Sequence, residues 1–346
     1  MVRVPRPPAQ GDVPVIDVSV VIPAYNAAAT LGATLASVRE QTIAPREVIV
    51  VDDGSTDDTG AIARAAGATV HRQENRGLTG ARNAGVARAT SSWIAQLDAD
   101  DLWAPEKLAA SWSAIQADAG CGLVFTDLWQ FDENGLLNAS VLHELPQRMD
   151  AVRRDPVAEG VWRCDRMTLA DEVARHAVMM PSALMIRRDL LDAVGGSDES
   201  IRGLGEDIEL ELRLLVHSDA LFVDAPLMGY RRHGANLTAN RSAQRASPLK
   251  VAERVAAAPS RYLPSTVNWY RREGAALRFI AGRMAAAEGD HASARRYLRG
   301  SLRERPAART LAWLLVSYAI DNPLGRSAMR AALRARFARR AHVAGP

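Results

Sequence analysis

Short apolar runs alternate with segments of helical spacing through the first hundred residues of the chain. The apolar runs are rich in β-branched residues and predict buried strands at residues 17–23, 47–51, 68–71 and 93–97. Apolar positions three and four residues apart predict helices over 27–40 and 78–89, and Asp57 and Asp58 suit the start of another. Alternating strands and helices indicate an α/β fold with a mostly parallel sheet flanked by helices.

The pattern loosens after residue 101. Strands are expected over 122–126 and 182–186, and helices over 105–116, 188–194 and 207–217. Residues 132–175 have no clear period and are left unassigned. Beyond about residue 242 the pattern is almost entirely helical.

Two clusters of acidic residues follow the apolar runs. Asp52 and Asp53 come directly after the second run, and Asp98, Asp100 and Asp101 follow the fourth. Because parallel sheets bind ligands at the carboxyl ends of their strands, both clusters are expected in one pocket. Like charges this close repel one another, and Mg²⁺ or Mn²⁺ would relieve the repulsion through carboxylate ligands. The alternative is an acidic cap on the next helix.

Charge divides the chain into two parts. Residues 1–240 hold 22 Lys and Arg against 34 Asp and Glu, whereas residues 241–346 hold 21 basic and 6 acidic residues. The net charge of +3 conceals this asymmetry, which suggests two parts with different roles. The basic part could meet anionic lipid, nucleic acid or the acidic part, or it could reflect only an Arg- and Ala-rich composition.

Missing motifs argue against several classes of protein. The two cysteines form no Cys-x-x-Cys pair, which disfavours a disulfide framework and a thiolate zinc site. No Gly-rich loop of the Rossmann or P-loop type occurs. Residues 1–14 are proline-rich and polar, which predicts a disordered N-terminus and no signal peptide. The longest apolar run, residues 311–320, is too short to cross a bilayer.

Several longer motifs occur in a fixed order along the chain. They are VSVVIPAYN (18–26), VIVVDDGSTDDT (48–59), ENRGLTGARNAG (74–85), LDADD (97–101), GGSDESIRGLGEDIELELR (195–213) and YRRHGAN (230–236). Together they resemble the family 2 glycosyltransferases over roughly residues 15–240. The resemblance implies a GT-A fold whose catalytic domain spans 15–240, with 15–101 as the nucleotide-binding half and 102–240 as the acceptor half.

The resemblance also implies a donor site. The residues that match positions around the nucleotide are Pro23, Tyr25, Asp53, Arg82, Asn83 and Asp98. Tyr25 would lie against the base, and Asp53 would accept hydrogen bonds from it. Asp98 would face the ribose. Arg82 would contact phosphate, or alternatively form a salt bridge on the helix surface.

The same match implies a metal site and a general base. Asp100 matches the main ligand of a divalent cation, Mg²⁺ or Mn²⁺, that bridges the donor's diphosphate. His233 would add a ligand, or is an ordinary loop histidine. Asp207 matches the base that takes the proton of the acceptor hydroxyl, with Glu206 as the second candidate. Either carboxylate could instead cap the helix that begins there.

The segment 241–346 is expected to be a basic helical extension. Residues 269–306 fall near the spacing of a tetratricopeptide-type helix pair, which must stack on another element to bury its apolar face. Residues 326–340 alternate Arg with apolar residues, which fits a helix at a membrane surface but also a solvated helix or a disordered tail.

The resemblance therefore predicts a metal-dependent, inverting glycosyltransferase that uses a nucleoside-diphosphate sugar donor. The expected acceptor is a glycan or a lipid-linked molecule in bacterial surface polysaccharide or glycoconjugate synthesis, with no nucleic-acid partner. A cytoplasmic location with peripheral membrane contact through the basic helices fits that role. The alternatives are a sugar-1-phosphate nucleotidyltransferase, which would want a Gly-rich basic loop that residues 23–26 lack, and a non-catalytic nucleotide-sugar-binding scaffold.

Overall fold

The chain divides into two compact units that are described separately. The computed structural model describes residues 13–201, 203–234, 236–239 and 241–319. Unit 1 comprises Met1–Ala239 with Ala258–Val267, and unit 2 comprises Asn240–Ala257 with Asn268–Pro346. Nearly all of the N-terminus expected to be disordered, and the whole of the helix expected at 326–340, lie outside the described residues.

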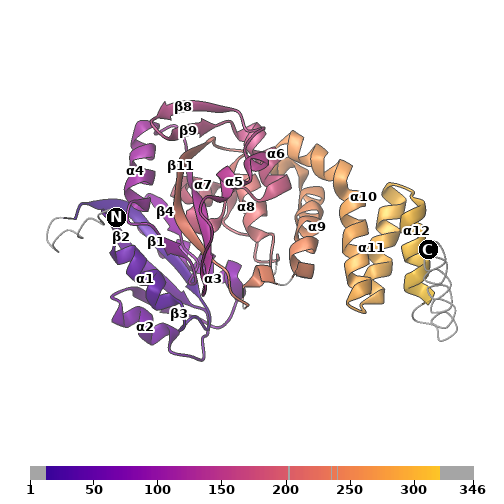
Figure 1. Cartoon of the computed structure of the whole chain (residues 1–346), viewed down its shortest axis with the longest axis horizontal. Helices are drawn as coiled ribbons and strands as arrows, with labels where there is room; N and C mark the ends of the chain where they lie inside the picture. The colour runs from indigo at the N-terminus through magenta and orange to yellow at the C-terminus, as the bar shows by residue number, and fades with distance from the viewer. Residues whose placement is uncertain (1–12, 202, 235, 240, 320–346) are drawn as a thin grey trace, which may run out of the picture. The chain divides into compact units, whose positions relative to one another are not determined.

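The first half of unit 1 is a parallel sheet flanked by helices (Figure 1). Its strands are β1 (Val15–Ala24), β2 (Ala44–Asp52), β3 (Thr69–Arg72) and β4 (Trp93–Gln96), in the order β3-β2-β1-β4. The connecting helices are α1 (Leu31–Arg39), α2 (Thr59–Ala65) and α3 (Gly77–Val86). A Cβ on Gly85 would lie 2.3 Å from the Val21 Cγ1 atom, so glycine lets α3 approach β1 closely. These are the elements that the alternating pattern predicts.

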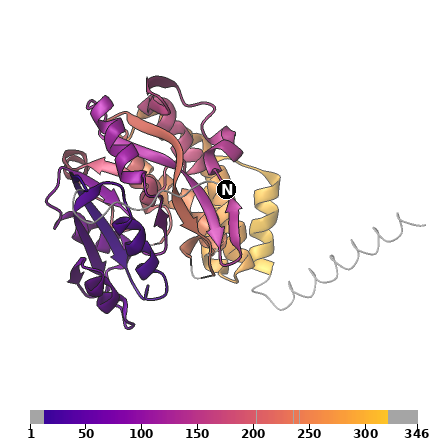
Figure 2. The same ribbon diagram turned by 60° about the vertical axis from the view of Figure 1, so that its left-hand side comes forward.

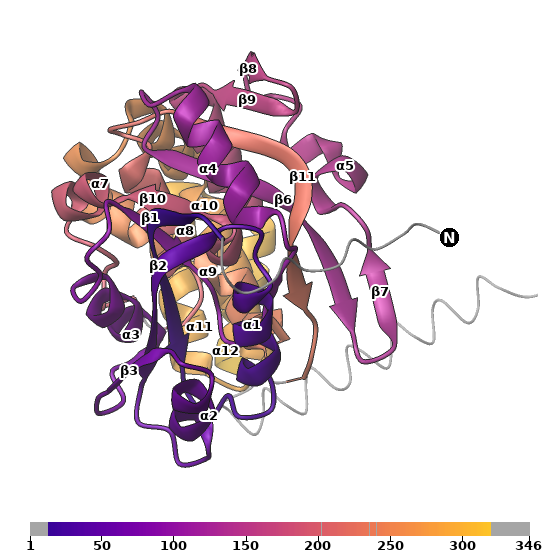
Figure 3. The same cartoon turned by 90° about the vertical axis from the view of Figure 1, so that its left-hand side faces the viewer.

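The sheet becomes mixed in its second half (Figure 3). β10 (Met185–Arg187) is antiparallel to β4 and to β6 (Leu123–Asp132), and β11 (Ala220–Arg231) is parallel to β6. The sheet ends in antiparallel β9 (Val161–Cys164) and β8 (Arg154–Ala158), while β5 (Leu102–Trp103) pairs with β11 and β7 (Gly135–Asn138) with β6. The prediction of a mostly parallel sheet therefore applies to the first half only.

Helices pack on this second half, and several of its elements lack a clear signal in the sequence. The longer helices are α4 (Lys107–Ala117), α6 (Arg166–His176), α7 (Arg188–Val194) and α8 (Glu206–Leu214). Residues 132–175 contain β7, β8, β9 and α6 together with short α5 (Val141–Glu144) and a 3₁₀ turn at Pro146–Arg148. β7 and β8 are largely exposed, so they carry no buried apolar period. β11 is interrupted by Asp224 and Pro226 at two register shifts, which hides the longest strand.

Unit 2 is helical, as the sequence predicts (orange to yellow in Figure 2). Its helices are α9 (Arg241–Ala257), α10 (Pro264–Ala287), α11 (His291–Glu304) and α12 (Ala308–Ala319). The turn between α10 and α11 has Gly289 at φ 84°, and Asp290 caps α11 by accepting a hydrogen bond from the Ser293 amide at 3.0 Å. Across the described residues, no helix is both long enough and apolar enough to span a membrane.

Ala258–Val267 belongs to unit 1, although the sequence assigns it to the basic extension. The hydroxyl of Tyr262 donates to Glu209 Oε1 at 2.5 Å, and Arg261 Nη2 donates to the Val194 carbonyl at 3.3 Å. Glu209 also receives two hydrogen bonds from Arg213, at 2.6 and 2.7 Å, in a fully buried ion pair. These contacts attach the segment to the end of α7 and to α8, which carries two of the predicted site residues.

Candidate active site

The carboxyl ends of the parallel strands open into a cavity of about 500 Å³ that lies within unit 1. Every predicted site residue except Asn83 lines this cavity. Those residues are Pro23, Tyr25, Asp53, Arg82, Asp98, Asp100, Glu206, Asp207 and His233. The fold therefore brings together side chains that lie more than two hundred residues apart in the sequence, as Pro23 and His233 do.

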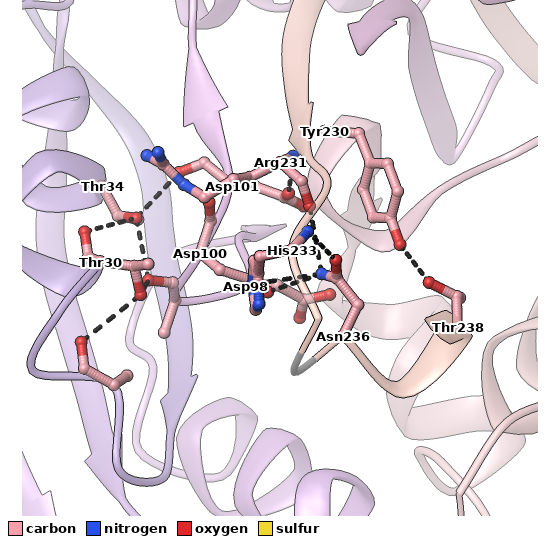
Figure 4. Close-up of polar contacts among 12 residues, drawn as sticks. Thr30, Thr34, Asp98, Asp100, Asp101, Tyr230, Arg231, His233, Asn236 and Thr238 are labelled. Atoms are coloured by element: carbon pink, nitrogen blue, oxygen red, sulfur yellow. Dashed lines mark hydrogen bonds and ion pairs between the residues drawn. The ribbon is translucent and has the colours of Figure 1, made fainter. Parts of the chain in front are cut away.

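The turn after β4 that carries the acidic cluster is held by hydroxyl groups of α1 and the residue before it. Thr34 Oγ1 lies 2.8 Å from the carbonyl oxygen of Asp101 and 3.0 Å from that of Ala99. Thr30 Oγ1 donates to the same Ala99 carbonyl at 2.9 Å (Figure 4). These bonds fix the backbone that presents Asp98 and Asp100 to the cavity.

Asp101 supports the turn from its buried side. Its side chain is 2% exposed, and its carboxylate accepts hydrogen bonds from Ser182 Oγ at 2.7 Å and from the Arg231 amide at 3.2 Å. Burial raises the pKa of Asp101 well above its ordinary value, and the charges of Asp100 and Asp98 raise it further. Asp101 does not line the cavity. Its contact with the Arg231 amide holds β11 against the turn.

Asp100 faces a histidine and an asparagine from the segment after β11. Asp100 Oδ2 lies 2.9 Å from His233 Nε2 and 3.2 Å from Asn236 Nδ2 (Figure 4). Burial and the neighbouring charge of Asp98 raise the pKa of Asp100, whereas the contact with His233 opposes that rise. Asn236 was not predicted as a site residue, although it ends the YRRHGAN motif, whose histidine was.

The donor set on this wall fits a divalent cation. Among the residues that the structure describes, no group of three or more His, Cys, Asp and Glu side chains is arranged to hold a metal. Mg²⁺ and Mn²⁺ need only one or two carboxylates when substrate phosphates and water complete the coordination. Asp100 and His233 supply an oxygen and a nitrogen on one wall of the cavity. A cation there would also relieve the repulsion between Asp98 and Asp100.

Arg82 forms a buried bridge between the two acidic walls. It is 3% exposed, and it donates from Nη2 to Asp98 Oδ1 at 2.7 Å and from Nη1 to Glu206 Oε1 at 3.1 Å. Burial by itself would lower the pKa of Arg82, but the charges of Asp98 and Glu206 outweigh it and raise the pKa. The salt-bridge alternative is therefore present, but Arg82 is buried and forms it at the wall of the cavity instead of on an exposed helix surface.

Glu206 and Asp207 begin α8 on the opposite side of Arg82. The N-cap of α8 is Gly205, at φ 106°, and Asp207 Oδ1 accepts a hydrogen bond from the Ile208 amide at 2.8 Å, so Asp207 satisfies a first-turn amide of the helix and also lines the cavity. Burial and the charge of Asp207 raise the pKa of Glu206 to about 7 although Arg82 opposes the rise, and Glu206 Oε2 has no hydrogen-bond partner in the described chain. Burial also raises the pKa of Asp207. A carboxylate with a raised pKa is a stronger proton acceptor, as a general base requires.

Asp53 organises the loop at the other end of the cavity. Its carboxylate accepts hydrogen bonds from the backbone amides of Arg76 at 2.9 Å and Gly77 at 2.8 Å, and from Gln73 Nε2 at 2.7 Å. A carboxylate offers about four lone pairs, so one remains for a ligand. Tyr25 lies on the rim with 53% of its surface exposed, which leaves its ring free to stack on a base.

Asn83 points away from the cavity toward the segment before α8. The side-chain Oδ1 of Asn83 accepts a hydrogen bond from the backbone N–H of Ser197, and its Nδ2 donates to the Ser197 carbonyl, both at 2.9 Å. It also donates to Glu199, which in turn pairs with Arg76 at 2.7 Å. Asn83 therefore ties α3 to the chain that leads into Glu206.

Comparisons with known proteins identify the family and the fold of this chain. The model of the family described as glycosyl transferase family 2 matches residues 19–171. The chain is 33% identical over 265 residues to validoxylamine A glucosyltransferase of Streptomyces hygroscopicus subsp. limoneus, a match that covers 68% of this chain and 56% of that protein. It is 33% identical over 210 residues to the succinoglycan biosynthesis protein ExoU of Rhizobium meliloti, covering 58% and 57%. The chain thus spans little more than half the length of these curated relatives.

Solved structures share the fold at low sequence identity. S. aureus TarS 1-349 in complex with UDP-GlcNAc is similar with a TM-score of 0.58 and 15% identity over 87% of this chain and 84% of that one. The mannosyltransferase PcManGT from Pyrobaculum calidifontis, in complex with GDP-Man and Mn²⁺, is similar with a TM-score of 0.53 and 18% identity over 90% and 82%. The predicted GT-A fold is confirmed, and the chain belongs to glycosyl transferase family 2.

Proposed function

We propose that this chain is a metal-dependent, inverting glycosyltransferase that moves a sugar from a nucleoside-diphosphate sugar to an acceptor hydroxyl. One observation carries the proposal: Asp100 with His233, and Asp207 with Glu206, face a single cavity, and Arg82 bridges Asp98 and Glu206 within it. The cavity thus offers a place for a metal-bound diphosphate and, across it, a proton acceptor. The solved structures with UDP-GlcNAc or GDP-Man and Mn²⁺ support the class of donor and cofactor.

The donor would extend along the cavity from the rim to the acidic turn. Tyr25 would stack on the base, with Pro23 and Asp53 beside it, and Asp98 would face the ribose. Asp100 and His233 would hold a divalent cation, which as a Lewis acid stabilises the negative charge that builds on the diphosphate. Arg82 would position Asp98 and Glu206 through its two buried ion pairs.

Asp207 would accept the proton of the acceptor hydroxyl. As that proton leaves, the acceptor oxygen bonds to the anomeric carbon while the bond from that carbon to the diphosphate oxygen breaks. The nucleoside diphosphate departs with the bonding electron pair. Attack from the face opposite the leaving group inverts the anomeric centre, and no enzyme nucleophile is needed.

The acceptor is proposed to be a glycan or a lipid-linked molecule of a bacterial surface polysaccharide. The relatives include a succinoglycan biosynthesis protein and a glucosyltransferase named for a diphosphoundecaprenol acceptor. The excess of basic residues after residue 240 would favour contact with anionic lipid at the inner face of the membrane. A nucleotidyltransferase is the less favoured alternative, because residues 23–26 read PAYN and lack the Gly-rich basic loop that its chemistry would want.

Nucleotide release tests the proposal directly. The chain is incubated with Mn²⁺, a panel of UDP- and GDP-sugars and candidate acceptors, and released UDP or GDP is measured. Asp207→Asn should lower kcat at least ~100-fold while donor binding, followed by thermal shift, persists. Asp155→Asn, at an exposed position of β8, is the matched control and should retain activity. Turnover by Asp207→Asn would refute the assignment of the base, and donor binding without any release by the wild type would favour the scaffold alternative.

A further inference from the structure

A second cavity of about 460 Å³ lies within unit 1 and shares no lining residue with the first. Its walls come from α5 and the turn after it, from the β8–β9 hairpin, and from β11 (Figure 3). These are largely the segments between residues 132 and 175 that the sequence leaves unassigned. The donor, metal and base assignments above use none of them.

The walls of this cavity are anchored to the sheet. Asp127 of β6 is fully buried, and its carboxylate accepts hydrogen bonds from the Leu142 amide at 2.9 Å and from the Ser140 hydroxyl at the start of α5. On the other side, Arg163 of β9 pairs with Asp118 at 3.1 Å and with Asp219 at 3.0 Å. The cavity therefore lies between elements that are attached by buried or partly buried polar contacts.

The cavity combines an apolar floor with a rim of mixed charge. The floor consists of the buried side chains of Leu142, Met149, Val152 and Phe222. Trp162 adds an indole whose buried Nε1 has no hydrogen-bond partner in the described part of the chain. The rim holds His143, Asp150, Arg154 and Asp224, with His143 Nε2 2.8 Å from Asp224 Oδ1 and the Arg154 guanidinium 5.9 Å from the Trp162 ring.

This mixture selects among classes of ligand. An acyl chain would leave the buried indole N–H of Trp162 without a partner and would bring hydrocarbon against Asp150, Arg154 and Asp224 at the rim. A phosphate or another anion would meet the carboxylates of Asp150 and Asp224. A neutral sugar ring has an apolar face for the aromatic floor and hydroxyl groups that both donate and accept hydrogen bonds. It can therefore satisfy Arg154, the indole N–H of Trp162 and the two carboxylates together.

We propose that this cavity binds a neutral sugar ring of the acceptor glycan, several rings away from the hydroxyl that reacts. The inference rests on the proposed function. Strand β11 connects the two cavities, since Asp224 lines this one and Tyr230 lines the first. Six residues of extended strand span at most about 20 Å, which is a length of several sugar rings. The acceptor is thus an oligosaccharide or polysaccharide chain, and a monosaccharide acceptor would leave this cavity empty.

Binding and kinetics test this inference on the full chain. The probes are neutral linear oligosaccharides of glucose, galactose and mannose, from disaccharide to hexasaccharide, studied by saturation-transfer NMR and calorimetry. Asp150→Ala and Arg154→Ala remove exposed rim groups, and Trp162→Leu removes the aromatic platform. Each substitution should raise the Kd for the longer probes about tenfold. The two rim variants should keep the melting temperature of the wild type. Glu159→Ala, in the exposed turn of the same hairpin, is the control.

The outcomes separate this site from the catalytic cavity. Asp207→Asn should bind the long probes as well as the wild type does, whatever happens to turnover. With an active acceptor series, the rim variants should raise KM for long acceptors and leave kcat and the donor KM unchanged. Three outcomes would overturn the inference: no probe binds, binding is the same in both rim variants as in the wild type, or only Asp207→Asn loses probe binding. A wild type that binds the probes through this rim but releases no nucleotide would overturn only the proposed function.

Discussion

Replacing Arg82 with Met tests whether the buried bridge holds the two acidic walls of the site together. Met preserves much of the side-chain volume and removes the charge. The side chains of Arg82, Glu206 and Asp98 are 4%, 5% and 28% exposed. Removing one partner of a buried ion pair costs about 3 to 5 kcal/mol, because the charge left behind is uncompensated. Partial hydration of Asp98 places the expected loss in the free energy of unfolding near about 3 kcal/mol.

The loss should depend on pH in a defined direction. Burial already raises the pKa of Glu206 to about 7, and Arg82 opposes that rise, so the variant should have a still higher pKa at Glu206. The folded variant then binds a proton more tightly than the unfolded chain does. The stability that protonated Glu206 contributes is fully present below its pKa in the unfolded chain. It is lost as pH rises through its pKa in the folded variant. The deficit relative to wild type should be smaller near about pH 5, where Glu206 is protonated in both proteins and only the pair with Asp98 is lost, and larger near about pH 8, above the pKa of Glu206 in the wild type.

Urea unfolding followed by tryptophan fluorescence at both pH values measures this loss. Adding Glu206→Gln to Arg82→Met removes one stranded charge and should recover part of the loss, which a double-mutant cycle quantifies. Arg46→Met is the control, because Arg46 pairs with Asp17 at 2.9 Å with side chains 56% and 37% exposed, and should cost less than about 1 kcal/mol. A loss below about 1 kcal/mol for Arg82→Met near pH 8, or an equal loss at both pH values, would refute the reasoning.

Three further predictions concern the site and its packing. The pH dependence of kcat/KM should rise through the raised pKa values of Asp207 and Glu206, with a component near pH 7 that Glu206→Gln removes; an acid limb at the ordinary carboxyl pKa would contradict this. Chelation with EDTA should abolish turnover and the stabilisation by UDP in thermal-shift assays, and Mn²⁺ should restore both; Asp100→Asn should need more Mn²⁺, and activity indifferent to EDTA would exclude the metal site. Gly85→Ala should cost about 1 to 3 kcal/mol, because its Cβ would lie 2.3 Å from Val21, whereas Gly32→Ala in α1, with its nearest neighbour at 3.9 Å, should be neutral or stabilising; equal melting temperatures for the two variants would contradict the packing argument.

Local patterns in the sequence were sufficient for the parallel half of the sheet. Residues 17–23 and 47–51 are short runs rich in β-branched residues, as buried strands require, and the structure confirms them as β1 and β2. The acidic clusters directly follow the runs at 47–51 and 93–97, so their shared position at the carboxyl edge follows from the direction of the strands. The motif order was likewise sufficient for the family. These features depend on neighbours in sequence, which periodicity and motifs record.

Contacts between distant residues were decided by the tertiary structure alone. Arg82 could be interpreted as a surface or phosphate-binding residue until packing placed it between Asp98 and Glu206, 16 and 124 residues away. Asn83, beside it in sequence, points instead to Ser197, because adjacent helical residues face different directions. The second cavity joins α5, the β8–β9 hairpin and β11. Strand β8 is exposed and β11 is interrupted, so neither carries a clear buried apolar period. The sequence determined which chemical groups this protein has and where its central strands lie along the chain. Only packing decided which charged side chains meet. A buried ion pair forms where the folded chain excludes water, and residues that are far apart in the sequence can meet there.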